Sequence, residues 1–237
     1  MAVLGKLYLI PNFIGDETIE TSFPSENQNI IHSLRLFFVE REKTSRSFLS
    51  KMKHPLSFNE IQLKELPNKK SKTTVGYEWL QPLLKGQSAG LISEAGMPAV
   101  ADPGENLILL AHELGIEIKP LIGPSSILLA LAASGLNGEA FSFHGYLPID
   151  KKEKTRQIKF LEGLSRNQNQ TQIFMETPYR NNQMIEDLVK VCSPSTKLCL
   201  AANLNSAKSY IKTKTIAEWK GATPNLNKVP CIFLIGN

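Results

Sequence analysis

A turn of small residues interrupts the apolar pattern at residues 93–104, which read SEAGMPAVADPG. Two glycines and two prolines lie in this turn, between a predicted strand and a predicted helix. In open α/β sheets ligands bind beyond the carboxyl ends of strands, and small residues let backbone groups approach a ligand closely. The segment is therefore a candidate ligand-binding turn, with a tight strand-to-helix connection as the alternative. Asp102, Pro103 and Glu105 predict that the helix begins at Asp102.

A second candidate is the segment GPSS at residues 123–126, which opens another predicted helix. The hydroxyls of Ser125 and Ser126, together with free N–H groups at the helix start, can bind a polar or anionic group. The alternative is that Ser125 only caps the helix. Two basic stretches, at residues 69–72 and 151–156, can hold phosphates or can be ordinary solvated faces.

The other reactive side chains indicate neither a metal site nor a disulfide framework. The three cysteines are odd in number and form no C-x-x-C pair, which predicts reduced thiols. The four histidines lack the spacing of metal ligands: His32, His54, His112 and His144.

Alternating strands and helices must position these residues. The first half predicts strands at 6–11, 36–40, 88–93 and 116–122, with helices between them at 26–35, 44–52, 75–84 and 102–115, and a further helix at 127–133. The second half predicts helices at 151–164 and 177–191 and strands at 141–147, 171–176, 197–204, 209–214 and 231–235. The fold class is therefore α/β, with a mainly parallel first sheet and a mixed second sheet. We place the two domains at residues 1–135 and 136–237.

Composition agrees with a globular chain of 237 residues, with 42% hydrophobic and 21% charged residues. The net charge of +5 is compatible with an RNA partner, although many metabolic enzymes are equally basic. No signal peptide precedes the first strand and no apolar run approaches ~18 residues, so we expect a cytoplasmic protein with no membrane span.

Five segments resemble, in order, those of the tetrapyrrole methylases, the class III S-adenosylmethionine-dependent methyltransferases. They read YLIPNFIGD, SEAGMPAVADPG, PLIGPSS, FHGYLP and FMETPYR, at residues 8–16, 93–104, 120–126, 143–148 and 174–180. The resemblance covers nearly the whole chain and is nearest to the branch that methylates small-subunit ribosomal RNA. It suggests a shortened paralogue of that branch.

This resemblance implies two α/β domains with the methyl donor, S-adenosylmethionine, in the cleft between them. Relatives that modify tetrapyrroles carry an acidic residue where Met97 stands, whereas the ribosomal RNA branch lacks it; Met97 can also simply be a core residue. Carried over by position, the donor contacts are Ile14, Ala95, Gly96, Met97, Val100, Ser125, Ser126, Glu176 and Leu204.

The resemblance also assigns a catalytic candidate. Glu40 matches the Glu of the family motif A-E-D-T-R, where it positions the substrate or removes a proton; the alternative is an exposed charge at a strand end. The Asp and Thr of that motif are absent at residues 41–43, and the Arg-Glu pair of A-R-E-L-T-K is replaced by Ala202 and Asn203. The chain stops at Asn237, where the ribosomal RNA enzymes usually continue.

The sequence thus predicts a methyltransferase acting on a ribose 2′-hydroxyl of small-subunit ribosomal RNA, without a metal and as a homodimer. Two alternatives remain open. One is a methyltransferase for a tetrapyrrole-like small molecule, and the other is a non-catalytic paralogue that binds RNA or a partner.

Overall fold

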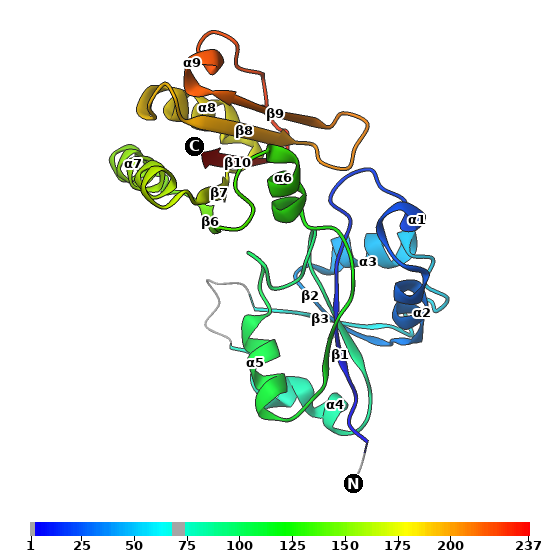
Figure 1. The fold of residues 1–237 in the computed structure, drawn as a ribbon. Coiled ribbons are helices and arrows are strands. Elements are labelled where there is room, and N and C mark those ends of the chain that lie inside the picture. Colours follow the sequence, from blue (N-terminus) through cyan, green and yellow to red (C-terminus); the bar gives the residue numbers. More distant parts are fainter. Residues whose placement is uncertain (1–2, 68–73) are drawn as a thin grey trace. The chain divides into compact units, whose positions relative to one another are not determined.

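The computed structural model describes residues 3–67 and 74–237, which form two compact units (Figure 1). The first unit is Met1–Ser125 and the second is Ser126–Asn237. The expected boundary lay between Gly135 and Leu136; in the structure the helix α6 (Ser126–Ser134) packs on strands of the second unit instead. The basic stretch 69–72 lies outside the described residues.

The first unit is built on a parallel five-stranded sheet with the strand order β3-β2-β4-β1-β5. Its strands are β1 (Leu7–Ile10), β2 (Leu36–Val39), β3 (Gln62–Glu65), β4 (Ala89–Ile92) and β5 (Ile118–Pro120). The register pairs Val39 with Ile92 and Ile10 with Ile92, so the ends of β2, β4 and β1 lie at one edge.

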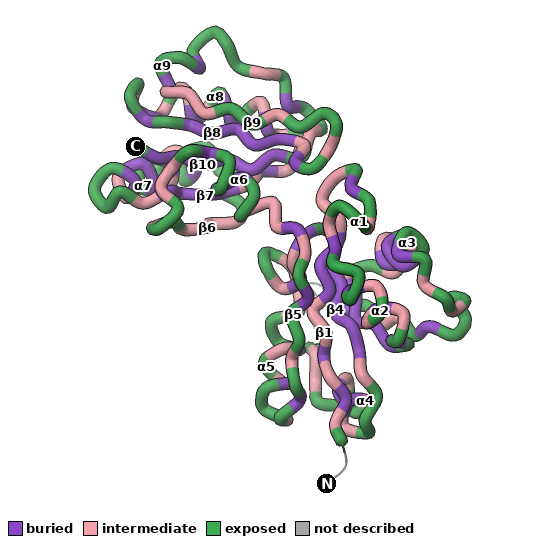
Figure 2. The backbone as a smooth tube through the Cα atoms, turned by 45° about the vertical axis from the view of Figure 1, so that its right-hand side comes forward, coloured by how far each residue is buried: buried purple, intermediate pink, exposed green. Residues whose placement is uncertain are grey.

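Helices cover both faces of this sheet, which is why its central strands are buried throughout (Figure 2). Phe37 and Val39 pack with Phe48 on one face, while Leu36 and Phe38 face the other. The helical elements are α1 (Ile19–Ser22), α2 (Ser25–Ser33), α3 (Glu42–Lys51), the 3-10 helix η1 (Tyr77–Leu80), α4 (Gln81–Leu84) and α5 (Glu105–Glu113).

A histidine ties the end of α3 to the end of α2. His54 Nε2 lies 3.0 Å from the carbonyl oxygen of Ile31 and 3.2 Å from that of Leu34, and Nδ1 accepts from the N–H of Leu56 at 3.3 Å. The neutral ring with its proton on Nε2 satisfies all three contacts. Burial lowers the pKa of His54, and the neighbouring His32 lowers it further.

We expect stability to depend on pH through His54. Because its folded pKa lies below the ordinary value of about 6.5, its contribution is complete above that value and is lost as pH falls toward and through the folded pKa. The melting temperature of wild type should therefore fall between pH 7.5 and 5.5. His54→Gln should show a smaller fall, whereas His112→Gln, at an exposed position, should match wild type. Equal falls in all three proteins would exclude this role.

The second unit contains a mixed five-stranded sheet with the order β6-β7-β10-β8-β9. β6 (Phe141–Tyr146) is parallel to β7 (Thr171–Met175), and the pairs β7 with β10 (Cys231–Gly236), β10 with β8 (Lys197–Ala202) and β8 with β9 (Tyr210–Thr215) are antiparallel. Since β10 runs against both neighbours, β7 and β8 end at the same edge of the sheet.

The helices of this unit are α7 (Lys151–Gln168), the 3-10 helix η2 (Pro178–Arg180), α8 (Asn181–Val191) and α9 (Ile216–Trp219), besides α6. Buried polar pairs lock α7 in place. Lys154 Nζ lies 2.6 Å from Asp187 Oδ2 of α8, and Glu162 accepts from the N–H of Ser193 at 2.6 Å and from Thr196 Oγ1. All three cysteines are buried and free, and burial raises the pKa of Cys192 to about 12.

The structure confirms the α/β class with one parallel and one mixed sheet, and each predicted strand has a counterpart. Strand β3 was missed, since Gln62, Lys64 and Glu65 give an edge strand little apolar signal. The predicted helix start at Asp102 was wrong. α5 begins at Glu105, because Gly104, with φ of 137°, turns the chain just before it. Within the described residues no helix is both long and apolar enough to cross a membrane.

Candidate functional site

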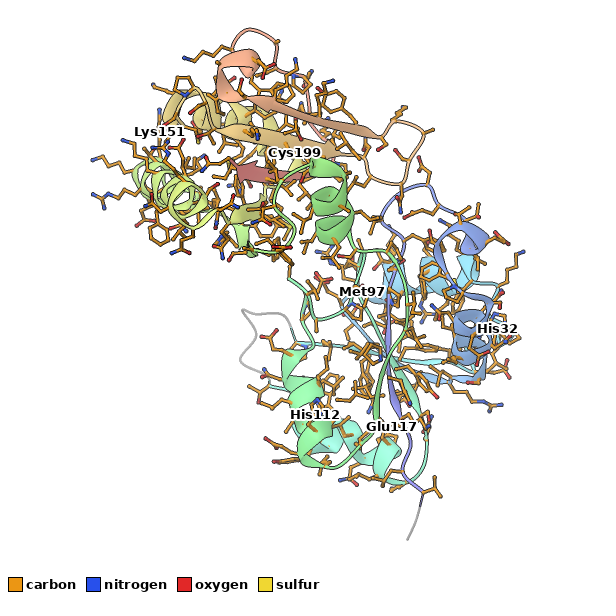
Figure 3. The ribbon with its side chains drawn as sticks, viewed as in Figure 1. His32, Met97, His112, Glu117, Lys151 and Cys199 are labelled. Carbon is orange, nitrogen blue, oxygen red and sulfur yellow. The ribbon has the colours of Figure 1, made fainter. Side chains whose placement is uncertain are left out.

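The loops after β1 and β4 are joined at the edge where these strands end. Asn12 and Gly96 form an antiparallel bridge in which Asn12 N donates to Gly96 O at 2.9 Å and Gly96 N donates to Asn12 O at 3.1 Å. Met97 follows directly, and Figure 3 shows it beyond the strands of the first sheet. The candidate turn of residues 93–104 is therefore held against the first loop.

Buried side chains fix this junction. Asn12 is 7% exposed, and its Nδ2 donates to the carbonyl oxygens of Ser93 (2.8 Å) and Glu94 (3.2 Å), while Oδ1 accepts from Phe13 N at 2.8 Å. Ser93 Oγ donates to Gly96 O at 2.7 Å. The side-chain amide of Asn12 therefore supplies the hydrogen bonds for backbone carbonyl groups that have no partner strand after the end of β4.

Asn12→Ala removes all three side-chain hydrogen bonds and should destabilise the chain by about 2 kcal/mol, because buried partners stay unsatisfied. Denaturant unfolding measures this loss. Asn29→Ala is the matched control, since Asn29 is exposed and makes a single 3.4 Å contact with Glu26. A loss no greater than that of the control would show that Asn12 does not hold the junction.

The turn itself contains an unusual run of left-handed backbone. Gly96 (φ 69°), Ala99 (φ 63°), Ala101 (φ 66°) and Gly104 (φ 137°) all have positive φ. An alanine in this conformation is strained by ~1 kcal/mol or more, and such strain is concentrated at ligand-binding and switch regions. In the described part of the chain, the N–H groups of Ala95, Met97 and Ala99 donate to no protein acceptor. The turn therefore presents backbone donors that a ligand can use.

The first loop borders this turn. The N–H groups of Ile14 and Gly15 donate to the carboxylate of the buried Glu17, at 3.3 and 2.6 Å, which fixes the loop. A Cβ built on Gly96 would lie 3.5 Å from Ile14 Cγ2 and 3.6 Å from the carbonyl oxygen of Pro124. Ile14, Gly96 and the segment that leads to Ser125 are thus brought together.

The remaining predicted contacts of the first unit follow the same edge. Ala95 and Val100 are exposed, and Met97 is half-buried, so these side chains are accessible rather than core residues. Ser125 is the last residue of the first unit and Ser126 is the first residue of α6. Both serines are half-buried.

Two carboxylates meet beside the turn, at the ends of neighbouring strands. Glu40 directly follows β2 and Glu94 lies two residues after β4. Thr44 Oγ1 donates to Glu94 Oε1, whereas Glu40 Oε2 is buried and has no hydrogen-bond partner among the described residues. Burial raises the pKa of Glu40, the charge of Glu94 raises it further, and Arg41 opposes the shift. An unpartnered carboxylate with a raised pKa is typical of a general base.

The second unit holds the other two predicted contacts at one edge of its sheet. Glu176 follows β7 and is 6% exposed; its Oε1 accepts from Thr177 N (2.6 Å) and from Arg180 Nη2 (2.7 Å) and Nε (3.1 Å). Leu204 follows β8 and is buried between Asn203 (φ 48°) and Asn205 (φ 56°). Arg180 therefore already neutralises the carboxylate of Glu176.

Sequence reasoning missed Asn12, Glu17, Thr44 and Glu94. Asn12 and Glu94 lie inside the motif segments, so their polar character beside small residues was an available signal. The contact of Thr44 with Glu94 depends on the pairing of β2 with β4, which no local pattern reveals. The described residues contain no group of three or more His, Cys, Asp or Glu that could hold a metal.

The protein is of the α/β class, with a strained turn at the strand ends of its parallel sheet, which is where open α/β sheets bind ligands. Residues 26–219 match the family model "Tetrapyrrole (Corrin/Porphyrin) Methylases". The chain belongs to this family, as the motif resemblance indicated.

Curated relatives include proteins named ribosomal RNA small subunit methyltransferase I. The protein of Vibrio cholerae is 35% identical over 156 residues, which cover 65% of this chain and 53% of the relative. The protein of Escherichia coli O157:H7 is 28% identical over 234 residues, which cover 98% of this chain and 77% of the relative. The match to the former spans about half of that protein's length.

Solved structures support the fold. The methyltransferase CobJ superposes with a TM-score of 0.63 at 18% identity, covering 98% of this chain and 94% of that one. Uroporphyrin-III-C-methyltransferase from Thermus thermophilus gives a TM-score of 0.56 at 17% identity, with 98% and 92% coverage.

Proposed function

We propose that this chain is an S-adenosylmethionine-dependent methyltransferase that modifies a ribose 2′-hydroxyl of small-subunit ribosomal RNA. The observation that carries the proposal is the junction of Asn12 with Gly96, which sets a turn of accessible backbone donors beside an unpartnered carboxylate. Family membership supplies the class of reaction, and the printed names of the relatives supply the substrate class.

The residues present fit the donor. The open backbone N–H groups of Ala95 and Met97 can bind its polar groups, and Ile14 and Val100 offer apolar surface to its adenine. Ser125 and Ser126 add hydroxyls near the start of α6, while Glu176 and Leu204 are proposed contacts that rest on the family resemblance alone. When bound, S-adenosylmethionine supplies an activated methyl group, so the chain mainly has to orient the acceptor and exclude water.

Glu40 is the residue we assign to the acceptor. A ribose hydroxyl must lose its proton as it attacks the methyl group, and a positioned base assists this step. The buried, unpartnered Oε2 of Glu40 can accept that proton. Burial and the neighbouring charge of Glu94 raise its pKa, which makes it a stronger base than an ordinary carboxylate.

The test is transfer of a labelled methyl group from S-adenosylmethionine to purified small ribosomal subunits that lack the modification. We expect label in the ribosomal RNA, at a ribose that then resists alkaline cleavage. Label on an added uroporphyrinogen instead would support the tetrapyrrole alternative. Absence of donor binding, with no transfer to either substrate, would favour the non-catalytic paralogue, to which the departures at Arg41, Glu42, Ala202 and Asn203 point.

We further propose that the chain acts as a homodimer beside ribosomes in the cytoplasm. Light scattering should then give twice the mass of the 26.3 kDa chain, and a monomeric mass at micromolar concentration would contradict the dimer.

A further inference from the structure

Positive charge is concentrated in the second unit. Ser126–Asn237 carries 14 Lys and Arg against 8 Asp and Glu, a net charge of +6, whereas Met1–Ser125 carries 13 against 14, a net charge of −1. These values add to the +5 of the whole chain. The basic character that suggested a nucleic-acid partner therefore belongs to one unit.

Within that unit, helix α7 has a basic exposed face. Lys154, Ile158, Leu161 and Ser165 are buried, which orients the opposite face toward solvent. Lys152, Arg156, Lys159 and Arg166 recur at helical spacing on that opposite face and are exposed, and their row spans about 21 Å at 1.5 Å per residue. Figure 3 shows Lys151, at the start of the same helix, on the outer side of the unit. We call Lys152, Arg156, Lys159 and Arg166 the α7 basic row.

Helix stability does not explain this charge. Lysines at the start of a helix face the positive end of its dipole and are unfavourable there, yet Lys151 and Lys152 open α7. Ion pairing does not explain it either. Among the described residues, Lys152, Arg156 and Lys159 form no salt bridge, whereas the buried Lys154 is paired with Asp187. Arg166 lies 3.8 Å from the carboxylate of Glu162, so the other three residues of the row present the unneutralised charge to solvent.

Two further residues on this face suit a nucleic acid. Phe160, which directly follows Lys159 in the sequence, is 59% exposed, and an exposed aromatic ring is a stacking surface for a base. Gly163 lies between Lys159 and Arg166, where a glycine weakens the helix. A Cβ there would meet nothing within 4 Å, so packing does not require the glycine. Its absence of a side chain lets a partner approach the helix backbone.

We propose that the exposed face of α7 binds the phosphate backbone of the RNA substrate through its basic row, with Phe160 stacking on an unpaired base. This inference rests on the proposed function and assigns that function its RNA-docking surface. Charge complementarity selects the partner, because phosphates repeat along RNA as the basic side chains repeat along α7.

The test compares the full chain with the variant Lys152→Glu/Arg156→Glu/Lys159→Glu, using transcribed small-subunit ribosomal RNA in filter binding at several salt concentrations. Loss of three phosphate contacts should weaken binding on the order of 100-fold at 0.1 M salt and reduce the salt slope by about 2. The control Lys197→Glu/Lys208→Glu/Lys220→Glu changes the charge equally at exposed positions elsewhere in the unit and should have a much smaller effect. Equal losses in both triple variants would overturn the proposal.

Phe160→Ala separates stacking from charge. It should weaken RNA binding about tenfold without changing the salt slope. Unchanged affinity would remove the stacking part of the proposal. If the α7 charge variant kept its RNA affinity but lost binding to phosphatidylserine vesicles, the surface would be a membrane interface and the proposal would fail.

A donor titration distinguishes this failure from failure of the proposed function. The α7 variants should bind S-adenosylmethionine as wild type does, because they lie outside the predicted donor contacts. If wild type methylates ribosomal RNA and the α7 charge variant binds RNA with the same affinity as wild type, only the proposed docking surface is wrong. If wild type binds no S-adenosylmethionine, the proposed methyltransferase activity is wrong. The comparison of RNA affinity between wild type and the α7 charge variant would still test the docking surface.

Discussion

Replacing Glu40 by glutamine is expected to lower the rate of methyl transfer by on the order of 100- to 10,000-fold, with donor affinity unchanged. Glutamine keeps the size and the position at the end of β2 but cannot accept a proton. The buried Oε2 of Glu40 has no hydrogen-bond partner among the described residues, so its role is not to hold the fold. Single-turnover transfer of labelled methyl to small ribosomal subunits measures the effect.

The pH profile gives this prediction a second, independent readout. Transfer requires ionised Glu40, so the rate should decrease as the pH is lowered through the pKa of Glu40. Because this pKa is raised, the decrease should occur above the ordinary carboxyl value of 4.5. Glu94→Gln removes the neighbouring charge that contributes to the shift and should move this acid limb to lower pH. An acid limb that stays in place in Glu94→Gln would contradict the coupling of the two carboxylates.

Glu42→Gln is the matched control for Glu40→Gln. Glu42 lies two residues along the chain and pairs with Arg46 at 3.2 Å on the first turn of α3. Its replacement should leave the transfer rate within about twofold of wild type, as expected for a surface ion pair. If Glu40→Gln transfers methyl as fast as Glu42→Gln, Glu40 is not the base and a water or the donor itself must remove the proton.

The second large effect is expected at Gly96. A side chain there starts at contact distance from Ile14 and the carbonyl of Pro124, so the ring of Gly96→Trp must fill the space beside the turn. We expect donor affinity to fall on the order of 100-fold or more, equivalent to about 2.7 kcal/mol. Isothermal titration with S-adenosylmethionine and S-adenosylhomocysteine measures this loss.

Gly115→Ala is the control for backbone strain. Gly115 has φ of 68°, against 69° for Gly96, and a Cβ there would meet nothing within 4 Å. The alanine variant therefore has the same left-handed backbone strain, about 1 kcal/mol, but its side chain lies away from the candidate turn. Donor affinity should be unchanged in Gly115→Ala. Wild-type affinity in a folded Gly96→Trp protein would place the donor elsewhere.

Much of the fold follows from local pattern, because buried strands and amphipathic helices leave strong periodic signals. The parallel first sheet and the mixed second sheet were both predictable from the order of elements. Strand β3 was not, since its charged edge sequence has little apolar periodicity. The start of α5 was misplaced because Asp102, Pro103 and Glu105 satisfy the rules for a helix start, while the left-handed turns at Ala99 and Ala101 leave no mark in the sequence.

The candidate site divides in the same way. The small residues of the turn, above all Gly96, could be identified from the sequence by their composition and by the family motif. The hydrogen bonds of Asn12 to Ser93 and Glu94, and the neighbouring carboxylates of Glu40 and Glu94, join segments about 50 to 80 residues apart. Such contacts depend on the strand order β2-β4-β1. The same elements are compatible with several other strand orders, so the sequence alone does not predict these contacts.

The most direct test of the donor site is a crystal structure of the full chain with S-adenosylhomocysteine. We predict that the ligand contacts the backbone of Ala95 and Met97 and the side chain of Ile14. Density for the ligand away from residues 93–104, or well-folded crystals that exclude it at saturating concentration, would contradict the assignment of this turn as the donor site.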